Sequence, residues 1–443
     1  MAVTGRYVLF MLIGVIPVLA FGVLFDAGGL ALAAWLLLSI LLGVLDLIVA
    51  GSPRTLGIER TIPTRIRLGE SADVRLLVTN NGTRTVRGIV RDAWQPSAGP
   101  NRSRVRMTIP SGERRGADFI LTPFRRGERR TVQVTVRSIG PLGLWARQAT
   151  LAAPGAIHVL PPFNSRRHLP SRLTRLRELD GRTAVMVRGQ GTEFDSLREY
   201  VRGDDVRSID WRATARRGTG PGGASQQVMV RTWRPERDRR VVLVLDAGRT
   251  SAARVQDEPR LDTAFEASLL LAALATRAGD RVDMISYDRR VRARVQGATG
   301  AELLSRMVDA MSLLEPDLIE TDWTAVPSQV RAITSQRSLV VILTSIESAG
   351  SSKALLSMLP QLTRRHMVVI ASVVDPEILA STSTRGDREA VYRAAAAERA
   401  LLDQSRVAAA LRQVGAEVVT GAPADLPPAL ADRYIALKAA GRL

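Results

Sequence analysis

The sequence of 443 residues predicts an α/β protein with a doubly wound C-terminal domain, an antiparallel β region before it and two apolar helices at the N-terminus. Two long apolar runs open the chain, alternating apolar residues follow, and strand-like runs then alternate with amphipathic helical patterns. We expect four parts: a transmembrane hairpin over 1–53, a β-sandwich over 54–160, a charged connector over 161–240 and the α/β domain over 241–443.

The apolar runs cover residues 7–25 and 30–50, and only Asp-Ala-Gly-Gly separates them. Each run is long enough to cross the hydrocarbon core of a membrane. The alternatives are a buried hairpin or a signal peptide, but a signal peptide has a shorter apolar core and no second long run directly behind it. The connecting loop has no Lys or Arg, whereas Arg6 and Arg54 flank the outer ends. The positive-inside rule therefore predicts a membrane protein with both termini and the soluble domains in the cytoplasm.

The net charge of +19 comes from the middle of the chain. Residues 54–160 hold 19 Arg and 7 acidic residues, whereas 241–443 hold 24 basic and 24 acidic residues. A basic segment beside a membrane suits the anionic inner leaflet, so the charge does not require a nucleic-acid partner. Asp46 lies near the cytoplasmic end of the second apolar run and is expected to be an interfacial residue rather than a proton or ion carrier.

Histidine and cysteine usage argues against several kinds of site. The chain has no cysteine, which excludes disulfides, thiolate metal sites and a cysteine nucleophile. Its three histidines are far apart in the sequence and form no HxxxH or HxH pair, which argues against a zinc hydrolase.

Strand patterns dominate the segment after the apolar runs. SADVRLLVTNNGTRTVRGIVRDAW (71–94) alternates apolar and polar residues on both sides of an Asn-Asn-Gly turn. In GERRTVQVTVRSIGPLG (127–143), the side chains of Val132, Val134 and Val136 share one face. These patterns predict a small antiparallel β-sandwich that ends near the Pro-Pro pair at 161–162.

The pattern changes at residue 241, where strands and helices begin to alternate. Apolar strands are expected at 239–246, 281–288, 338–345, 367–375 and 416–421, with 291–296 as a hairpin partner. Helices are expected at 261–280, 301–314, 324–333, 353–365 and 387–414, followed by a terminal helix. This alternation is typical of a doubly wound sheet with helices on both faces.

A dense charged segment, EFDSLREYVRGDDVRSIDWRATARR (193–217), lies between the two soluble parts. Acidic residues and arginines nearly balance, which argues against a nucleic-acid groove. Neighbouring arginines lower carboxyl pKa values, which argues against proton transfer and hence against an enzyme. Two compatible interpretations remain: a charge network that braces the connector against the α/β domain, with Trp211 as its apolar anchor, or a docking surface. The candidate partner-binding residues are Arg198, Asp204, Asp205, Arg207, Asp210 and Trp211.

This segment also carries a family resemblance. FDSLREYVRGDDVRSIDWRATARR, VMVRTWRPERDRRVVLVLDAGRT and the upstream FRRGERRTVQVTVRSIGPLGLW resemble the bacterial family called "domain of unknown function 58". The resemblance implies a C-terminal domain similar to a von Willebrand factor A domain and a partnership with a MoxR-type ATPase of the AAA+ superfamily. Together with the apolar hairpin it therefore implies a scaffold or adaptor anchored in the bacterial inner membrane, in a chaperone-like assembly system, with no small-molecule substrate. The alternative is a cell-envelope assembly factor that acts without the ATPase.

The resemblance also directs attention to a metal site. Domains of the von Willebrand A type can hold magnesium above the sheet with an Asp-x-Ser-x-Ser loop, a Thr from a second loop and an Asp from a third. Asp246 and Thr250 match the first loop, and Thr321 or Asp322 would come from the second.

Two departures from that pattern predict a degenerate site. Gly248 replaces the first Ser, and Ser345 stands where a metal-binding member would offer an Asp. Arg249 would place a positive charge near the cation. We therefore expect magnesium binding, if any, to be weak and dispensable. The alternative role for Asp246 is to cap the following turn or to pair with Arg249.

Overall fold

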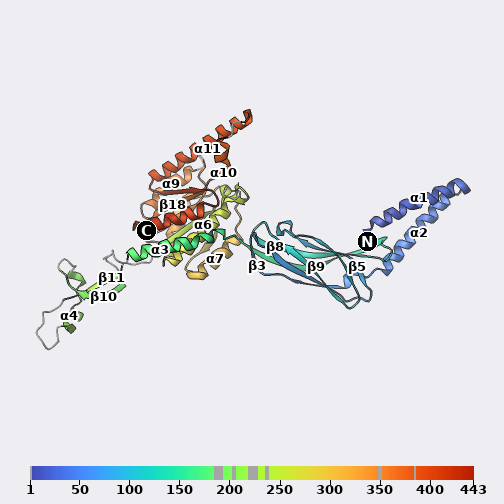
Figure 1. Cartoon of the computed structure of the whole chain (residues 1–443), viewed down its shortest axis with the longest axis horizontal. Coiled ribbons are helices and arrows are strands. Elements are labelled where there is room, and N and C mark those ends of the chain that lie inside the picture. Colours follow the sequence, from blue (N-terminus) through green and yellow to red (C-terminus); the bar gives the residue numbers. More distant parts are fainter. Residues whose placement is uncertain are drawn as a thin grey trace. The chain divides into compact units, whose positions relative to one another are not determined.

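The computed structural model describes residues 2–183, 193–201, 206–217, 228–234, 239–347, 352–383 and 386–443. The chain divides into two compact units, Met1–Pro162 and Phe163–Leu443. The first holds two apolar helices and an antiparallel β region, and the second holds a mostly parallel sheet with helices (Figure 1). The predicted mixed α/β architecture is confirmed at this level.

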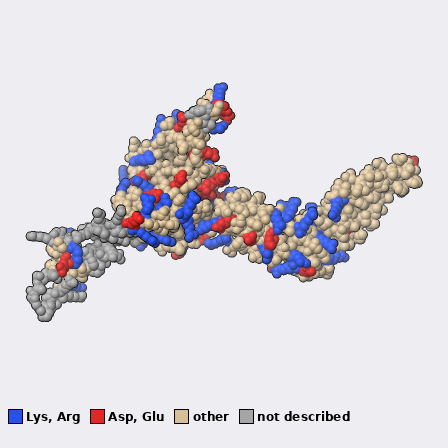
Figure 2. Space-filling view, viewed as in Figure 1, with Lys and Arg blue, Asp and Glu red and all other residues tan. Residues whose placement is uncertain are grey.

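Helices α1 (Gly5–Phe25) and α2 (Gly28–Val49) form the N-terminal pair. Thr4 caps α1, and Asp26 ends it in a left-handed conformation, at a φ of 48°. Both helices are long and apolar enough to cross a membrane, with mean hydropathies of 2.8 and 2.5 for the two candidate spans. They expose large apolar side chains along their length, and Figure 2 shows them almost free of charge on the face in view.

The β region of the first unit contains two sheets. The larger sheet has the order β1-β9-β8-β5-β6, with β3 also on β9, and the smaller has the order β2-β4-β7. Val74, Leu76, Phe119 and Ile157, from both sheets, are buried in one hydrophobic core. The strands are β1 (Ala2–Val3), β2 (Leu56–Thr61), β3 (Arg65–Arg67), β4 (Ala72–Asn80), β5 (Val86–Trp94), β6 (Arg104–Ile109), β7 (Arg114–Leu121), β8 (Gly127–Ile139) and β9 (Trp145–Leu160), with short helices η1 (Pro53–Thr55) and η2 (Pro96–Ala98).

The second unit is built on a six-stranded sheet of order β16-β15-β12-β17-β18-β19. All neighbouring pairs are parallel except β15 and β16. The strands are β12 (Arg240–Asp246), β15 (Arg281–Tyr287), β16 (Val291–Val295), β17 (Leu339–Leu343), β18 (Met367–Val373) and β19 (Glu417–Gly421), and a two-stranded ladder pairs β13 (Arg254–Val255) with β14 (Glu258–Pro259).

Helices cover both faces of this sheet. Helices α8, α9 and α11 pack on the face formed by Val242, Val244, Val340 and Ile342, whereas α6 and α12 contact the strands from the other side. The helices are α5 (Arg249–Ala252), α6 (Arg260–Arg277), α7 (Gly300–Ser312), η5 (Trp323–Ala325), α8 (Val326–Ile333), α9 (Lys353–Thr363), α10 (Pro376–Ser381), α11 (Arg388–Gln413) and α12 (Leu426–Ala439).

The first part of the predicted connector belongs to the second unit. It forms η3 (Asn164–His168) and α3 (Leu169–Thr183), and α3 contacts α6 and α12. The buried carboxylate of Glu266 on α6 accepts the backbone N–H groups of Asn164 and Ser165, at 2.7 and 2.9 Å. The chain is thus tied to the α/β domain well before the strand β12.

The charged segment forms a second, smaller element. Strands β10 (Glu193–Glu199) and β11 (Met229–Arg234) pair antiparallel, and η4 (Val206–Ser208) and α4 (Trp211–Arg217) lie between them in sequence. An isolated bridge joins Ile209 to Val230.

Candidate functional site

The carboxyl edge of the α/β sheet is the place where its topology favours a site. Numbered along the chain, the six strands lie in the order 3-2-1-4-5-6, so the direction of winding reverses between β12 and β17. Ligands of doubly wound proteins bind at this switch point. Asp246 is the last residue of β12, and Thr344 follows the end of β17.

Asp246 is 2% exposed, and its carboxylate is surrounded by donors. Its Oδ1 accepts the backbone N–H of Gly248 at 2.9 Å and the hydroxyl of Thr321 at 2.5 Å. Its Oδ2 accepts the hydroxyls of Thr250 at 3.2 Å and of Thr344 at 2.6 Å. Four donors from the same chain therefore satisfy both oxygens of a buried polar group that would otherwise be costly.

Gly248 explains why the loop departs from the Asp-x-Ser-x-Ser pattern. A Cβ at this position would lie 2.3 Å from Thr321 Oγ1 and 2.9 Å from the carbonyl oxygen of Ile319. The space that a serine side chain would need is taken by the hydroxyl that bonds Asp246. Gly248 and Thr321 therefore fit together as a pair.

The fourth metal candidate, Asp322, has hydrogen bonds of its own outside this cluster. Asp322 caps η5 and accepts the backbone N–H and the hydroxyl of Thr324, at 3.0 and 2.5 Å. Arg249 donates to Glu320 at 2.6 Å rather than to Asp246. The Ser345 hydroxyl is buried and has no hydrogen-bond partner among the described residues.

This donor set does not fit a tight magnesium site. Magnesium prefers six oxygen ligands in octahedral geometry and is usually held by one or two carboxylates together with waters. Among the cluster residues only Asp246 is a carboxylate, and both of its oxygens are occupied. Within the described parts of the chain, no group of three or more acidic, histidine or cysteine residues could hold a metal ion. The cluster instead holds together the loops that carry Gly248, Thr321 and Thr344 at the carboxyl edge of the sheet.

Of the six partner-binding candidates, four lie within the described residues. Arg198 lies on β10, Arg207 on η4, Asp210 just before α4 and Trp211 at its first residue, whereas Asp204 and Asp205 lie outside the described residues. Trp211 is 67% exposed, so the expectation that it is an apolar anchor is wrong. Trp211 is the first residue of α4, and its side chain faces the solvent there.

Asp210 organises this element. Its Oδ1 accepts the backbone N–H groups of Arg212 and Ala213, both at 3.0 Å, and its Oδ2 accepts the Arg231 Nε–H at 2.7 Å. The hydrogen bond from the Ala213 N–H is the largest cause that holds the pKa of Asp210 below its ordinary value, and the hydrogen bond from Arg231 also lowers it. Asp210 thus joins α4 to β11 as an ionised cap.

Asp46 has a structural role that the sequence interpretation as an interfacial residue does not include. Asp46 is fully buried, and its carboxylate accepts the backbone N–H groups of Leu142, Leu144 and Trp145 at 2.8, 2.7 and 3.0 Å. A Cβ on Gly140 would lie 2.1 Å from Asp46 Oδ1, so the turn can close on the carboxylate only with glycine there. The Gly-Pro-Leu-Gly-Leu-Trp turn between β8 and β9 therefore fixes α2 to the β region.

Comparison with known proteins finds a family model that matches part of the chain. Residues 196–381 match the family model described as Protein of unknown function DUF58. This range contains the Asp246 cluster and most of the charged hairpin, by which we mean β10 and β11 with the η4 and α4 segment between them, and the family resemblance is confirmed over it. No curated protein matches the chain.

Several solved structures resemble the chain over about a quarter of its length. The CARDB domain of a Pyrococcus furiosus protein is 20% identical and covers 24% of this chain and 94% of that chain, with a TM-score of 0.18. A complex of zinc 2-glycoprotein and prolactin inducible protein from human seminal plasma is 12% identical, with coverages of 23% and 92% and a TM-score of 0.20. A FixG-related protein from Vibrio parahaemolyticus is 8% identical, with coverages of 24% and 96% and a TM-score of 0.17. TM-scores this low do not establish a shared fold.

Proposed function

We propose that the protein is a membrane-anchored scaffold that binds a MoxR-type AAA+ ATPase and works as its adaptor in a chaperone-like assembly system. The choice of a MoxR-type partner rests on the family resemblance of residues 196–381. The choice of binding over catalysis rests on the Asp246 cluster, whose one carboxylate is saturated by donors of its own chain. Because each oxygen of Asp246 already accepts two hydrogen bonds, the group offers little room for a metal ion or a substrate.

The membrane anchor is the first part of the proposal. The two apolar helices are joined by a short loop without basic residues, and the arginine-rich β region follows directly. The positive-inside rule then favours a cytoplasmic location for both termini and both soluble parts. The bacterial inner membrane is the compartment that suits this arrangement and the absence of cysteine.

The second part is that the α/β domain is of the von Willebrand A type and the β region is a sandwich. The strand order 3-2-1-4-5-6 with an antiparallel third strand supports the first assignment. Two sheets that share one core support the second. A von Willebrand A domain whose metal loop is degenerate would act as a rigid platform for protein contacts.

The docking surface of this proposal is the charged hairpin, in particular Arg198, Arg207, Asp210 and Trp211. The exposed indole of Trp211 is the observation that supports it most directly, because exposed tryptophans and arginines dominate the binding energy of protein interfaces. Asp204 and Asp205 remain candidates by sequence alone.

A pull-down with the full-length protein from detergent-solubilised native membranes tests the proposal. We expect a MoxR-type ATPase to be recovered with the wild-type chain and to be lost, by tenfold or more, with Trp211→Ala, as for a hot-spot residue. The matched control is Leu313→Ala, because Leu313 is also 67% exposed and lies at the end of α7 in the α/β domain. Circular dichroism of each variant establishes that it is folded.

Recovery of envelope-assembly enzymes without any ATPase would favour the alternative of an envelope factor that acts alone. Equal recovery of the ATPase with Trp211→Ala and wild type would place the docking surface elsewhere. Either result would contradict docking at the charged hairpin without contradicting the membrane anchor, because cysteine labelling tests the anchor independently.

A further inference from the structure

The first unit has a hollow of about 550 Å³ at the base of the apolar helices, and arginines surround it. Arg87 and Thr108 lie opposite one another on β5 and β6, and Ile89 lies opposite Arg106. Their neighbours Val86, Val90 and Ile109 point into the core, so these four side chains lie on the outer face of the sheet. This face lines the hollow together with the start of α1 and the β8–β9 turn.

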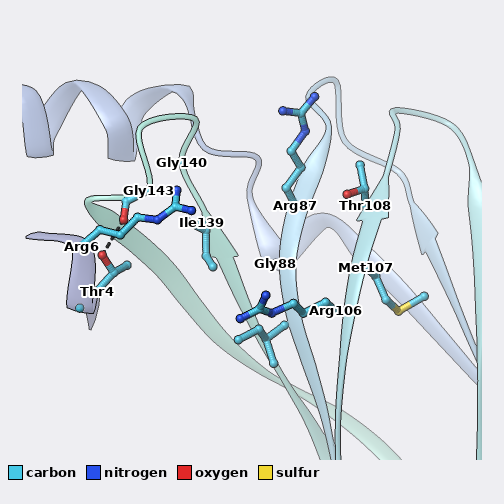
Figure 3. A pocket seen from close by; sticks show the side chains of 12 residues that line it. Thr4, Arg6, Arg87, Gly88, Arg106, Met107, Thr108, Ile139, Gly140 and Gly143 are labelled. Atoms are coloured by element: carbon cyan, nitrogen blue, oxygen red, sulfur yellow. Dashed lines mark hydrogen bonds between the residues drawn. The ribbon is translucent and has the colours of Figure 1, made fainter.

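Three arginines, Arg6, Arg87 and Arg106, line this hollow, with Arg87 extending away from the other two, and none of the described residues that line it is acidic. In Figure 3, Arg6 and Arg106 extend toward one another from opposite sides. Within the described parts of the chain, none of the three forms an ion pair or a side-chain hydrogen bond. Elsewhere in the same unit arginines do find partners, as Arg60 does with Asp92 at 2.7 Å. The hollow thus concentrates positive charge that the protein does not neutralise.

The start of α1 adds a second source of positive potential. Thr4 accepts the N–H of Tyr7, whereas the N–H groups of Gly5 and Arg6, the first two residues of the helix, have no partner within it. Thr4 is fixed by a hydroxyl bond to the carbonyl oxygen of Gly143 at 2.5 Å and by β1, which pairs with β9 (Figure 3). The helix end is therefore held in place beside the arginines.

The apolar surface of α1 begins within one turn of the hollow. Leu9 is exposed and lies three residues after Arg6, which corresponds to about 4.5 Å along a helix axis. Tyr7 packs edge-on against Trp145 at 5.9 Å between ring centroids, an aromatic pair of the kind found at membrane–water interfaces. If α1 crosses a membrane as proposed above, the hollow lies at the level of the lipid headgroups.

We propose that this hollow binds a phosphate group, and that the phosphate is that of an anionic phospholipid headgroup. Arginine is suited to phosphate because its fork of N–H donors matches the phosphate oxygens, and a helix N-terminus adds backbone donors. The assignment of the phosphate to a lipid depends on the membrane anchor of the proposed function. The phosphate site itself does not depend on it. A free phosphate compound from the cytoplasm would use the same groups.

Calorimetric titration of the full-length protein in dodecyl maltoside micelles tests the site with three probes. These are dihexanoylphosphatidylglycerol, dihexanoylphosphatidylcholine and inorganic phosphate. We expect saturable binding of the phosphatidylglycerol, weakened about tenfold or more by Arg87→Ala and by Arg106→Ala, because each removes a charged hydrogen bond. Arg54→Ala is the matched control, since Arg54 is exposed near the end of α2 and does not line the hollow.

Preference for phosphatidylglycerol over phosphatidylcholine and inorganic phosphate supports a lipid headgroup. Equal binding of inorganic phosphate, with the same loss in both variants, supports the phosphate site and assigns a soluble source. The proposal is overturned if no probe binds saturably or if Arg54→Ala weakens binding as much as Arg87→Ala. No partner ATPase is present, so the result is independent of the pull-down.

Discussion

Two buried aspartates, Asp46 and Asp246, hold loops in place by accepting hydrogen bonds from them. Each accepts hydrogen bonds from several donors on loops far away in sequence, and each requires a glycine next to it. Asp246 looks like a metal ligand in the sequence because its position matches the first residue of a known pattern. Its environment shows a different role, in which it ties together three loops at the edge of the sheet.

Gly248→Ser tests this role of Asp246. The substitution restores one residue of the metal pattern, but its Cβ would meet Thr321 Oγ1 and the carbonyl oxygen of Ile319. Because the backbone oxygen cannot move freely, we expect a loss of about 1–3 kcal/mol in the free energy of unfolding. Thermal unfolding followed by circular dichroism measures it, and Gly386→Ser is the control, since a Cβ there meets no atom within 4 Å. A stable Gly248→Ser variant with micromolar magnesium affinity by calorimetry would contradict the structural role.

Asp46→Asn tests the attachment of α2 to the β8–β9 turn. The amide replaces one acceptor oxygen with a donor, so at least one of the N–H groups of Leu142, Leu144 and Trp145 loses its partner. We expect hydrogen exchange of residues 142–145 to accelerate on the order of tenfold or more. Asp26→Asn is the matched control, because Asp26 is exposed in the loop between the two helices. Unchanged protection at 142–145 would show that the carboxylate does not hold the turn.

At the level of elements, periodicity in the sequence predicted most of the second unit. The strand at 338–345 is found as β17, and the helix at 387–414 as α11. The first is a continuous apolar run and the second a long run of good helix formers rich in alanine, so local sequence determines both. Helix α3 was missed because its residues are mostly polar, and its place depends on contacts with α6 and α12.

The side-chain clusters were harder to predict than the elements that carry them. Asp246, Thr250 and Thr321 meet because strand and loop ends converge at one sheet edge, which topology makes foreseeable. Thr344 also bonds Asp246. Its position directly after an apolar strand was the feature of the sequence that could have predicted this contact. The role of Asp46 depends on a turn almost a hundred residues away, and no local pattern encodes such a contact.

Glu258 on β14 gives the second unit a defined dependence on pH. Burial raises the pKa of its carboxyl group, and the nearby charges of Asp262 and Glu266 raise it further, against a hydrogen bond from Thr263. The folded protein therefore holds this proton to higher pH than the unfolded chain does. The contribution of Glu258 to stability is present below the unfolded pKa of about 4.3 and is lost as pH rises through the folded pKa.

Glu258→Gln removes this dependence. We expect the variant to gain melting temperature over wild type at pH 7 and to lose that advantage near about pH 3, where Glu258 is protonated in both states. The measurement is thermal unfolding at both pH values, with Glu389→Gln as control on the exposed first turn of α11. An equal difference at the two pH values would mean that Glu258 is not a buried, destabilised carboxyl.

At the scale of the whole molecule, charge and apolar surface are divided among the parts of the chain. The excess of arginine follows the apolar helices directly, and the α/β domain is neutral. In a freely soluble protein the large apolar side chains of α1 and α2 would be exposed to water, which is unfavourable. In a membrane-anchored protein they would lie in lipid, and the arginines would lie beside the anionic membrane surface. The proposed orientation therefore has consequences that can be measured on the intact chain.

Cysteine labelling in cells tests this orientation, and the natural absence of cysteine provides a clean background. We expect Ala27→Cys, in the loop between α1 and α2, to react with a membrane-impermeant maleimide in intact spheroplasts. Leu379→Cys, at an exposed position of α10, should react only after the membrane is permeabilised. The reverse pattern would place the soluble parts outside the cytoplasm and remove an ATP-driven cytoplasmic partner from consideration. Labelling of both sites in intact spheroplasts would show that the two helices do not cross the membrane as a hairpin.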